Sequence, residues 1–176
     1  MASLLIVTGP PGAGKSTVSA LLAADPTRSV LVEGDRFFGF LAEGAIEPWL
    51  PTSHHQNEVV TEAAAAATGR FGIDYDTVYD GIVGPWFLPA FARSTGLPEL
   101  DYAVVLPPVD VCIDRVRNRT GHGFDDEAAT RAMHRAFTEA DVDDRHVLRD
   151  VAPDPQTSAA AIRAARSNGR LRYLVG

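Results

Sequence analysis

The fold is decided by eight consecutive residues, Gly9-Pro10-Pro11-Gly12-Ala13-Gly14-Lys15-Ser16. They fit the pattern G-x-x-x-x-G-K-[ST], in which glycines let backbone N–H groups turn inward around phosphate oxygens. A short apolar run from Ser3 to Thr8, rich in β-branched residues, precedes them, and apolar residues at helical spacing follow from Lys15. A strand, this loop and a helix N-terminus in that order predict a binding site for the phosphates of a nucleoside triphosphate.

The single lysine of the chain lies in this loop. The other 15 basic residues are all arginine, and a lysine ammonium is a compact charge that fits among oxygens where a planar guanidinium would not. We predict that Lys15 reaches the β- and γ-phosphates and acts in catalysis, that Ser16 ligates Mg²⁺, and that Thr17 completes the segment that holds the triphosphate. Mg²⁺ and a purine nucleoside triphosphate, ATP or GTP, are therefore expected here.

Outward from the loop, short apolar segments alternate with helical patterns. Ser53 and Gln56 are predicted to form a capping box at the start of one helix, and Gly69 is predicted to be the C′ residue at which it stops. Strands that alternate with helices predict an α/β fold, in which helices cover both faces of a parallel sheet. The expected strands are residues 3–8, 29–33, 77–80, 102–106 and a closing strand at 171–175, and the expected helices are residues 15–24, 53–69, 109–119, 127–140 and 158–166.

Length and composition restrict the class of protein. A chain of 176 residues with a net charge of −7 is expected to form one domain, residues 1–176, and to lack the basic face that a nucleic-acid partner requires. The longest apolar runs, residues 4–7 and 63–67, are too short to cross a bilayer, and residues 1–8 lack the features of a signal peptide. We expect a cytoplasmic protein, monomeric or homodimeric, without a membrane or nucleic-acid partner.

Three motifs together resemble those of the P-loop kinases that phosphorylate small molecules. This group contains gluconate kinase, shikimate kinase, adenylylsulfate kinase and chloramphenicol phosphotransferase, together with the zeta-toxin-like kinases. Besides the loop at residues 9–16, the motifs are Glu33-Gly34-Asp35, which is similar to a D-x-D element at the end of the second strand, and Arg115-x-x-x-Arg119-x-Gly-His, which resembles the lid entry of gluconate kinase. The resemblance implies a three-layer fold like that of nucleoside monophosphate kinases, a five-stranded parallel sheet, ATP with Mg²⁺, and a mobile lid.

Carboxylates follow the ends of two predicted strands, where ligands bind in parallel sheets. Glu33 and Asp35 are two residues apart, so they project from one face of a strand. The resemblance implies that Asp35 takes the proton of the acceptor hydroxyl or holds it in line, and that Glu33 acts on Mg²⁺ through water. The alternative is a solvated turn in which Arg36 pairs with these carboxylates. Asp80 either contacts the acceptor or Mg²⁺, as in related folds, or belongs to an ordinary Asp-Gly turn.

Aromatic residues cluster after the second and third predicted strands. Phe38, Trp49 and Trp86 are the expected acceptor contacts, together with Asp35 and Asp80; the alternative places the aromatic rings in the core. The acceptor-binding segment is expected at about residues 36–70, and residues 36–100 contain three basic but eight acidic side chains. An anionic acceptor normally requires arginines, so we predict a neutral or cationic, partly apolar acceptor, an antibiotic or another metabolite. The clusters consist of Phe37, Phe38, Phe40 and Trp49, and of Trp86, Phe87 and Phe91.

Arginines close the helix expected at residues 109–119. Arg115 and Arg119 share one helical face, and the resemblance implies that Arg115 stacks on adenine while Arg119 clamps phosphate and acts in catalysis. Gly121 and Gly123 would give hinge freedom to a lid at about residues 115–140. Arg131 follows Glu127 by four residues, which favours a solvated ion pair over a role in the site.

These observations predict a kinase that transfers the γ-phosphate of ATP to a hydroxyl group of a small molecule. A nucleotide kinase is the alternative within enzymes, and a nucleotide-dependent switch or ATPase module is the alternative from another class. Against a GTPase, the chain has no N-K-x-D motif, and Val83 occupies the glycine position of D-x-x-G after Asp80. Against an AAA+ machine, no hydrophobic strand ends in Asp-Glu, and the length leaves no room for an extra helical domain.

Overall fold

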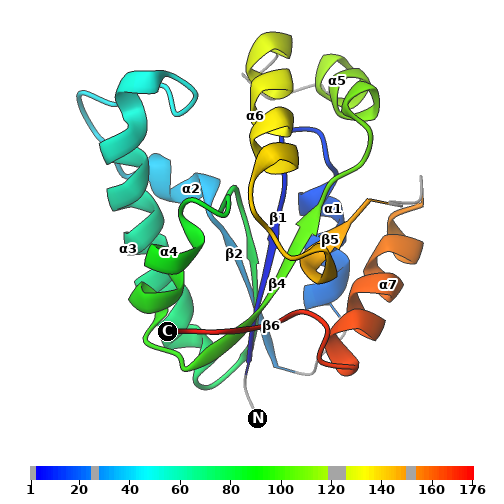
Figure 1. The fold of residues 1–176 in the computed structure, drawn as a ribbon. Coiled ribbons are helices and arrows are strands. Elements are labelled where there is room, and N and C mark those ends of the chain that lie inside the picture. Colours follow the sequence, from blue (N-terminus) through cyan, green and yellow to red (C-terminus); the bar gives the residue numbers. More distant parts are fainter. Residues whose placement is uncertain (1–2, 25–27, 119–125, 150–153) are drawn as a thin grey trace.

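The computed structural model describes residues 3–24, 28–118, 126–149 and 154–176. Helices lie on both sides of a central sheet (Figure 1). The elements in chain order are β1 (Ser3–Thr8), α1 (Lys15–Ala23), β2 (Ser29–Glu33), α2 (Asp35–Phe38), the 3₁₀ turn η1 (Pro51–Ser53), α3 (His54–Gly72), β3 (Asp76–Asp80), α4 (Leu88–Thr95), β4 (Glu99–Val105), α5 (Val109–Arg117), α6 (Glu127–Glu139), η2 (Asp144–His146), β5 (Val147–Leu148), α7 (Pro155–Ser167) and β6 (Arg172–Leu174).

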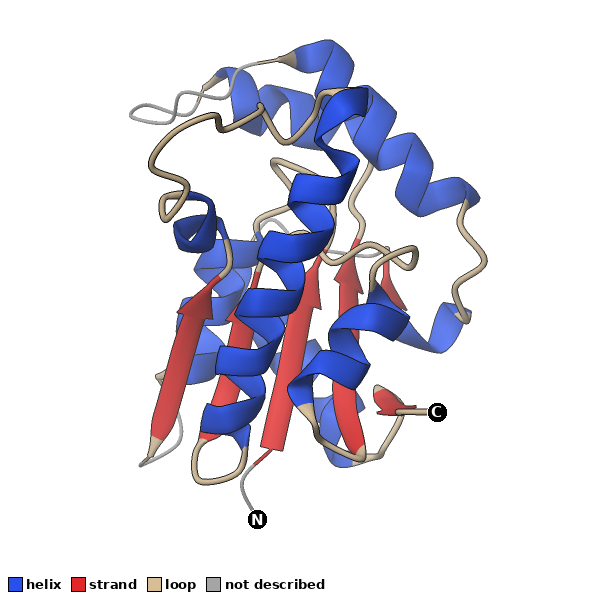
Figure 2. Cartoon of the chain, turned by 90° about the vertical axis from the view of Figure 1, so that its left-hand side faces the viewer, coloured by secondary structure: helices blue, strands red, loops and turns tan. Residues whose placement is uncertain are grey.

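The sheet confirms the predicted α/β class. Five parallel strands stand in the order β2-β3-β1-β4-β5, and β6 pairs with β4 in the antiparallel direction. Figure 2 shows the long strands running in one direction, with their carboxyl ends at the same edge. Val7, Glu33 and Asp80 pair in register at that edge. The ends of β1, β2 and β3 therefore bring the phosphate loop and the carboxylates together.

Successive residues of β1 point alternately into two hydrophobic cores, one on each face of the sheet. Leu4 and Ile6 pack on one face with side chains of α3, α4 and α6, whereas Leu5 and Val7 pack on the other with side chains of α1, α5 and α7. All four are at most 1% exposed. A strand buried on both faces reads as a continuous apolar run, which is why this segment was recognisable from the sequence.

The sequence did not predict strand β5, helices α2 and α4, or the 3₁₀ turns η1 and η2. The fifth parallel strand is β5, which has only two residues and is specified by its pairing with β4 rather than by a pattern of its own. Helix α4 begins within the aromatic cluster expected to line the pocket, and its Phe91 is fully buried in the core. The closing strand expected at residues 171–175 is β6, and it lies at Arg172–Leu174.

The predicted ends of the helix at residues 53–69 were wrong. Ser53 makes no capping hydrogen bond to this helix, and its side chain contacts the preceding segment instead. The helix continues to Gly72, and Gly69 lies inside it. A Cβ atom at Gly69 would lie 1.9 Å from the carbonyl oxygen of Thr95, so this glycine permits close packing of α3 on α4 rather than ending the helix.

Among the described residues, no helix is both long enough and apolar enough to cross a membrane.

Candidate active site

The loop at residues 9–16 owes its shape to glycines in the left-handed region of backbone conformation. Gly9, Gly12 and Gly14 have φ angles of 143°, 74° and 93°. A Cβ atom at Gly9 would lie 2.1 Å from the carbonyl oxygen of Val105, and one at Gly12 would lie 2.2 Å from that of Cys112. Both the conformation and the available space therefore demand glycine at these two positions. At these two glycines the backbone of the loop packs directly on the backbone at the end of β4 and on that of α5.

Two positive side chains contact this loop. The ammonium of Lys15 donates to the carbonyl of Pro10 at 3.0 Å, so it lies over the loop. The guanidinium of Arg115 donates to the carbonyls of Ala13 at 3.2 Å and Gly12 at 3.4 Å. The structure therefore places Arg115, expected to stack on adenine, against the backbone of the phosphate loop.

The structure describes only some of the other residues of the predicted lid. Arg119, Gly121 and Gly123 lie outside the described residues. Arg131 forms the expected ion pair with Glu127, and Arg117 pairs with the same carboxylate.

Asp80 is a buried carboxylate beside the loop. Its side chain is 8% exposed, and its Oδ1 atom accepts no hydrogen bond from the described residues. Burial raises the pKa of Asp80, a hydrogen bond from Ser16 and the charge of Lys15 lower it, and the negative charges of Asp35 and Glu33 raise it again. Within the protein, an ionised Asp80 therefore has too few hydrogen-bond donors and positive charges around it. A bound cation would stabilise the charge of this carboxylate.

These residues fit a magnesium ion. Carboxylate and hydroxyl oxygens are the ligands that Mg²⁺ prefers, and in phosphotransferases the ion is held by one or two protein ligands together with phosphates and water. Asp80 and Ser16 supply two such oxygens next to the phosphate loop. Within the described part of the chain, no cluster of three or more His, Cys, Asp or Glu side chains is suited to hold a metal by itself.

Glu33 was the other expected magnesium ligand. It forms an ion pair with Arg36, and its side chain is half-exposed. This is the solvated turn that the sequence left open as an alternative. Asp80, in register with Glu33 on the neighbouring strand, is the carboxylate that lines the cavity, so the structure favours Asp80 over Glu33 for the metal.

Asp35 is placed by a tight turn over Tyr79. The backbone N–H of Gly34 donates to the carbonyl of Asp80 at 2.8 Å, and a Cβ atom at Gly34 would lie 2.2 Å from the Tyr79 hydroxyl oxygen. Only glycine allows the chain to turn this closely, and the next residue, Asp35, begins α2 and lines the cavity. Burial, followed by the charges of Asp35 and Asp80, raises the pKa of Tyr79, which keeps its hydroxyl protonated.

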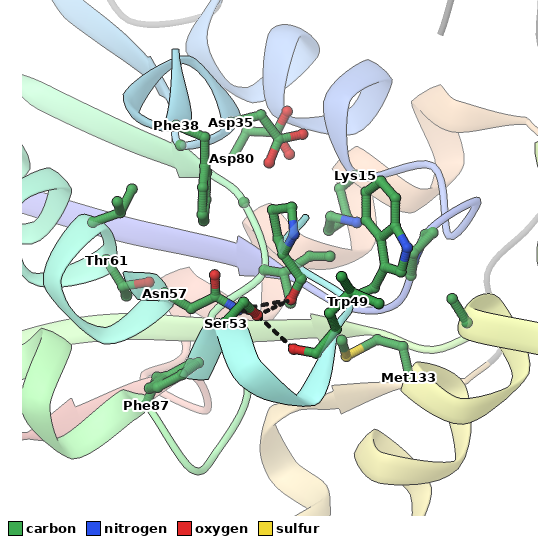
Figure 3. Close-up of a pocket in the computed structure, with 18 of the residues that line it drawn as sticks. Lys15, Asp35, Phe38, Trp49, Ser53, Asn57, Thr61, Asp80, Phe87 and Met133 are labelled. Carbon is green, nitrogen blue, oxygen red and sulfur yellow. Dashed lines mark hydrogen bonds between the residues drawn. The ribbon is translucent and has the colours of Figure 1, made fainter. Parts of the chain in front are cut away.

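A cavity of about 480 Å³ extends from the phosphate loop to an apolar wall (Figure 3). Among the described residues that line it, Lys15 is the only Lys or Arg, and Asp35 and Asp80 are the acidic ones. It is surrounded by helices α2, α3 and α6, by the segment at residues 48–51 and by the loop after β3. The lining consists of Pro11, Gly12, Lys15, Ser16, Gly34, Asp35, Phe38, Pro48, Trp49, Leu50, Pro51, Ser53, His54, Asn57, Val60, Thr61, Tyr79, Asp80, Gly81, Ile82, Trp86, Phe87, Val116, Ala129 and Met133.

All three aromatic residues expected to contact the acceptor line this cavity. Phe38 comes from α2, Trp49 from the segment before η1, and Trp86 from the loop before α4. The Trp86 ring packs on Phe137 with a centroid distance of 5.3 Å. The other members of the two clusters divide between the cavity, the core and the surface: Phe87 lines the cavity, Phe37 packs on the core, Phe91 is in the core, and Phe40 is 76% exposed.

Sequence reasoning missed several residues of the cavity. Asn57, Thr61 and Met133 line it, and His54 stacks on Phe87 with a centroid distance of 5.5 Å. Asn57 and Thr61 are four residues apart on α3 and therefore share a face. That spacing was visible, but nothing in the sequence indicated which face of the helix turns toward the strand ends.

The family of the chain follows from a comparison with family models. The model described as an AAA domain matches residues 4–140, which include the loop, both carboxylates and the start of the lid region. The chain belongs to this family. Membership establishes a P-loop domain and names no reaction; β3 of this domain ends in Asp80-Gly81 rather than in Asp-Glu.

Solved structures share the fold over nearly the whole chain. A sugar kinase from Janibacter sp. HTCC2649 aligns with a TM-score of 0.71 and 18% identity, covering 95% of each chain. The tunicamycin resistance protein of Deinococcus radiodurans aligns with a TM-score of 0.70 and 14% identity, covering 93% of this chain and 95% of the other. Shikimate kinase from Acinetobacter baumannii, solved with shikimate, gives 0.66 and 17%, covering 97% and 96%. A comparison with curated proteins found no match. At these identities the likeness establishes the fold, which is that of small-molecule P-loop kinases.

Proposed function

We propose that this P-loop domain is an ATP- and Mg²⁺-dependent phosphotransferase that moves the γ-phosphoryl group to a hydroxyl of a small, partly apolar, neutral or cationic acceptor. One observation carries the proposal. A single cavity joins the phosphate loop, through Lys15 and Ser16, to a carboxylate at Asp35 and to an aromatic wall. This arrangement would hold a phosphoryl donor and an apolar alcohol in contact, with a group between them that accepts a proton.

The donor half consists of residues 9–17. Their backbone N–H groups and the N-terminus of α1 would hold the triphosphate, and Lys15 would leave the carbonyl of Pro10 to contact the β- and γ-phosphates. Arg115, which contacts the same loop, and Arg119 would stabilise negative charge on the transferring group. Mg²⁺, held by Ser16 and Asp80, would neutralise charge on the phosphate oxygens.

The acceptor half is arranged around Asp35. The acceptor hydroxyl oxygen forms a bond to the γ-phosphorus, the bond from that phosphorus to the β,γ-bridging oxygen breaks, and ADP leaves with the electron pair. Asp35, exposed to the cavity at the start of α2, takes the hydroxyl proton or holds the hydroxyl in line. The aromatic side chains of Phe38, Trp49 and Trp86 would exclude water from this step, which limits wasteful hydrolysis of ATP.

The charge of the cavity supports the proposed acceptor class. Lys15 is already committed to the phosphates, and the described lining offers no arginine for a second anionic group. A nucleoside monophosphate would bring such a group, and phosphate recognition normally uses arginines. A neutral or cationic alcohol therefore fits better than a nucleotide. The similar structures include a sugar kinase, a shikimate kinase and a tunicamycin resistance protein, so the fold alone does not select an acceptor.

The proposal is tested by ADP release with MgATP and a panel of small alcohols and nucleoside monophosphates. We expect turnover with alcohols and not with nucleotides, and a phosphate monoester in the product by ³¹P NMR. Asp35→Asn should retain ATP affinity, measured by calorimetry, but lose turnover by about 10²-fold or more, because the positioned proton acceptor is gone. Full turnover in Asp35→Asn would overturn the role of this carboxylate, and the absence of MgATP binding to the folded wild type would overturn the proposal.

A further inference from the structure

One side chain of the acceptor cavity has an orientation fixed by its partners. The amide nitrogen of Asn57 lies 2.7 Å from the carbonyl oxygen of Pro48 and 2.9 Å from the hydroxyl oxygen of Ser53. A carbonyl oxygen can only accept a hydrogen bond, so the atom facing Pro48 must be the NH₂ group. The two possible assignments of the amide are thus distinguished by chemistry, and its oxygen must face the other way.

The donors around this amide are all used inside the protein. Both N–H bonds of Asn57 are taken by Pro48 and Ser53, and the Ser53 hydroxyl donates its own hydrogen to the carbonyl of Leu50 at 2.7 Å or to that of Pro48 at 2.9 Å. The oxygen of Asn57 is buried and accepts no hydrogen bond from the described residues. Figure 3 shows this oxygen pointing away from the dashed bonds, and Asn57 lines the cavity.

A buried amide oxygen without a donor costs free energy, whereas the same oxygen is satisfied when a ligand brings an N–H or O–H group. The carboxylate of the acceptor half, Asp35, imposes the same demand, because an ionised carboxylate only accepts hydrogen bonds. The aromatic faces of Phe38, Trp49 and Trp86 carry partial negative charge, which attracts cations. The cavity therefore selects a ligand that donates hydrogen bonds and carries positive charge.

We propose, on the basis of the proposed phosphotransferase function, that the acceptor is an amino alcohol and that Asn57 binds its ammonium group. The ammonium donates to the free oxygen of Asn57, while the hydroxyl of the same molecule faces Asp35 and the γ-phosphate. An ammonium makes a stronger hydrogen bond to this oxygen than a second hydroxyl does. Asn57 thus determines specificity at a point separate from the reacting hydroxyl.

The chain provides a matched control for Asn57. Gln56, the preceding residue, also holds the segment before η1, because its side chain accepts from the N–H of Ile46 and donates to the carbonyl of Ile46, both at 2.7 Å. Both ends of this amide are occupied, and Gln56 is not among the residues that line the cavity. Loss of Gln56 would loosen the same segment without removing an acceptor for the ligand.

The first experiment compares aryl-alkyl alcohols that share one carbon skeleton and carry an ammonium, a methyl, a hydroxyl or a carboxylate at the same position. Initial rates of ADP release give kcat/KM for each compound. We expect the ammonium compounds to exceed the methyl analogues by about tenfold or more, because the analogues leave the Asn57 oxygen unsatisfied. Equal or higher kcat/KM for the methyl, hydroxyl or carboxylate compounds would overturn the inference alone. No turnover with any compound would overturn the proposed function and the inference together.

The second experiment measures the same ratio, ammonium over methyl compound, in Asn57→Ala and Gln56→Ala. In Asn57→Ala the ratio should fall toward one, because the oxygen that distinguishes the compounds is gone. In Gln56→Ala both rates should fall together with the ratio preserved, because only the support of the segment is lost. A ratio preserved in Asn57→Ala, or lost equally in both variants, would mean that Asn57 has a structural role only and would overturn the inference.

Discussion

The two halves of the cavity are built in different ways. The phosphate loop packs closely on other backbone, since Gly9 and Gly12 lie directly against the carbonyl oxygens of Val105 and Cys112, and the Arg115 side chain adds hydrogen bonds to the loop carbonyls. The acceptor wall is held by side chains, since the amides of Gln56 and Asn57 bind the backbone of a segment about ten residues earlier. Gly9 and Gly12 in the donor half therefore cannot be replaced without a shift of the backbone, while the acceptor half can change its ligand by exchanging a few side chains.

This difference corresponds to the chemistry of the two ligands. A triphosphate is the same molecule for every kinase, and converging N–H groups with one ammonium suffice to bind it. An acceptor varies in shape and charge, so its site benefits from side chains carried by loops and helix surfaces. Three further predictions test this contrast.

The largest effect is expected in the donor half, from Lys15→Ala. Turnover should fall by about 10²- to 10³-fold, because the only ammonium that reaches the transferring group is removed. The fold should persist, since the Lys15 side chain lies over the loop and lines the cavity and is not part of either hydrophobic core. Circular dichroism would check the fold and ADP release the activity. Turnover within a few-fold of the wild type would show that the loop does not act on the donor.

The second prediction compares one glycine from each half. Gly9→Ala should lower the free energy of unfolding by about 3 kcal/mol and weaken ATP binding, because the new Cβ atom meets the carbonyl oxygen of Val105 and the backbone must shift. Gly44, in the segment that precedes the acceptor wall, also has a positive φ of 70°, but a Cβ atom there would meet nothing within 4 Å. Gly44→Ala should therefore cost only about 1 kcal/mol of conformational strain.

Urea unfolding followed by fluorescence would measure both variants against the wild type. Equal losses of stability would mean that the two halves are equally rigid, which contradicts the contrast between backbone and side-chain support.

The same contrast explains which parts of the structure could be predicted from the sequence. The loop, β1, β2 and β3 were predictable because each is a contiguous pattern, and the carboxyl-end rule then placed Asp35 and Asp80 at the cavity. Strand β5 was not predictable, because it forms only through its pairing with β4. In that pairing, the N–H of Leu106 donates to the carbonyl of Leu148 at 2.9 Å. The acceptor wall depends on equally non-local contacts.

Ser53 and Gln56 show what the spacing of residues in a sequence cannot predict. Their spacing fits a capping box, a local interaction that is common at helix starts. In the structure each side chain binds an earlier backbone group instead, Gln56 at Ile46 and Ser53 at Leu50. Local and non-local partners of this kind cannot be distinguished by spacing alone, so the free oxygen of Asn57 became visible only in three dimensions.

The smallest effect is expected where the two halves meet, at Asp80. Because burial raises the pKa of this carboxyl in the folded state, its ionisation is harder there than in the unfolded chain. Its contribution to stability is fully present below the unfolded pKa of about 3.9 and is lost as the pH rises through the raised folded pKa. At neutral pH, Asp80→Asn should therefore stabilise the protein without ligands, raising Tm by about 2–4 °C, the shift that about 1 kcal/mol produces in a domain of this size.

This gain should be confined to neutral pH and to the protein without nucleotide. The difference in Tm between Asp80→Asn and wild type should shrink as the pH falls below the raised folded pKa of Asp80, because the carboxyl group is then protonated and neutral like the amide. MgATP should raise the Tm of the wild type but hardly that of Asp80→Asn, which lacks a ligand for the cation. Asp114→Asn, at an exposed position of α5, is the matched control and should leave Tm nearly unchanged at each pH. A lower Tm for Asp80→Asn at neutral pH would mean that the ionised carboxylate is satisfied within the protein, and the unpaired oxygen would then no longer argue for a magnesium site.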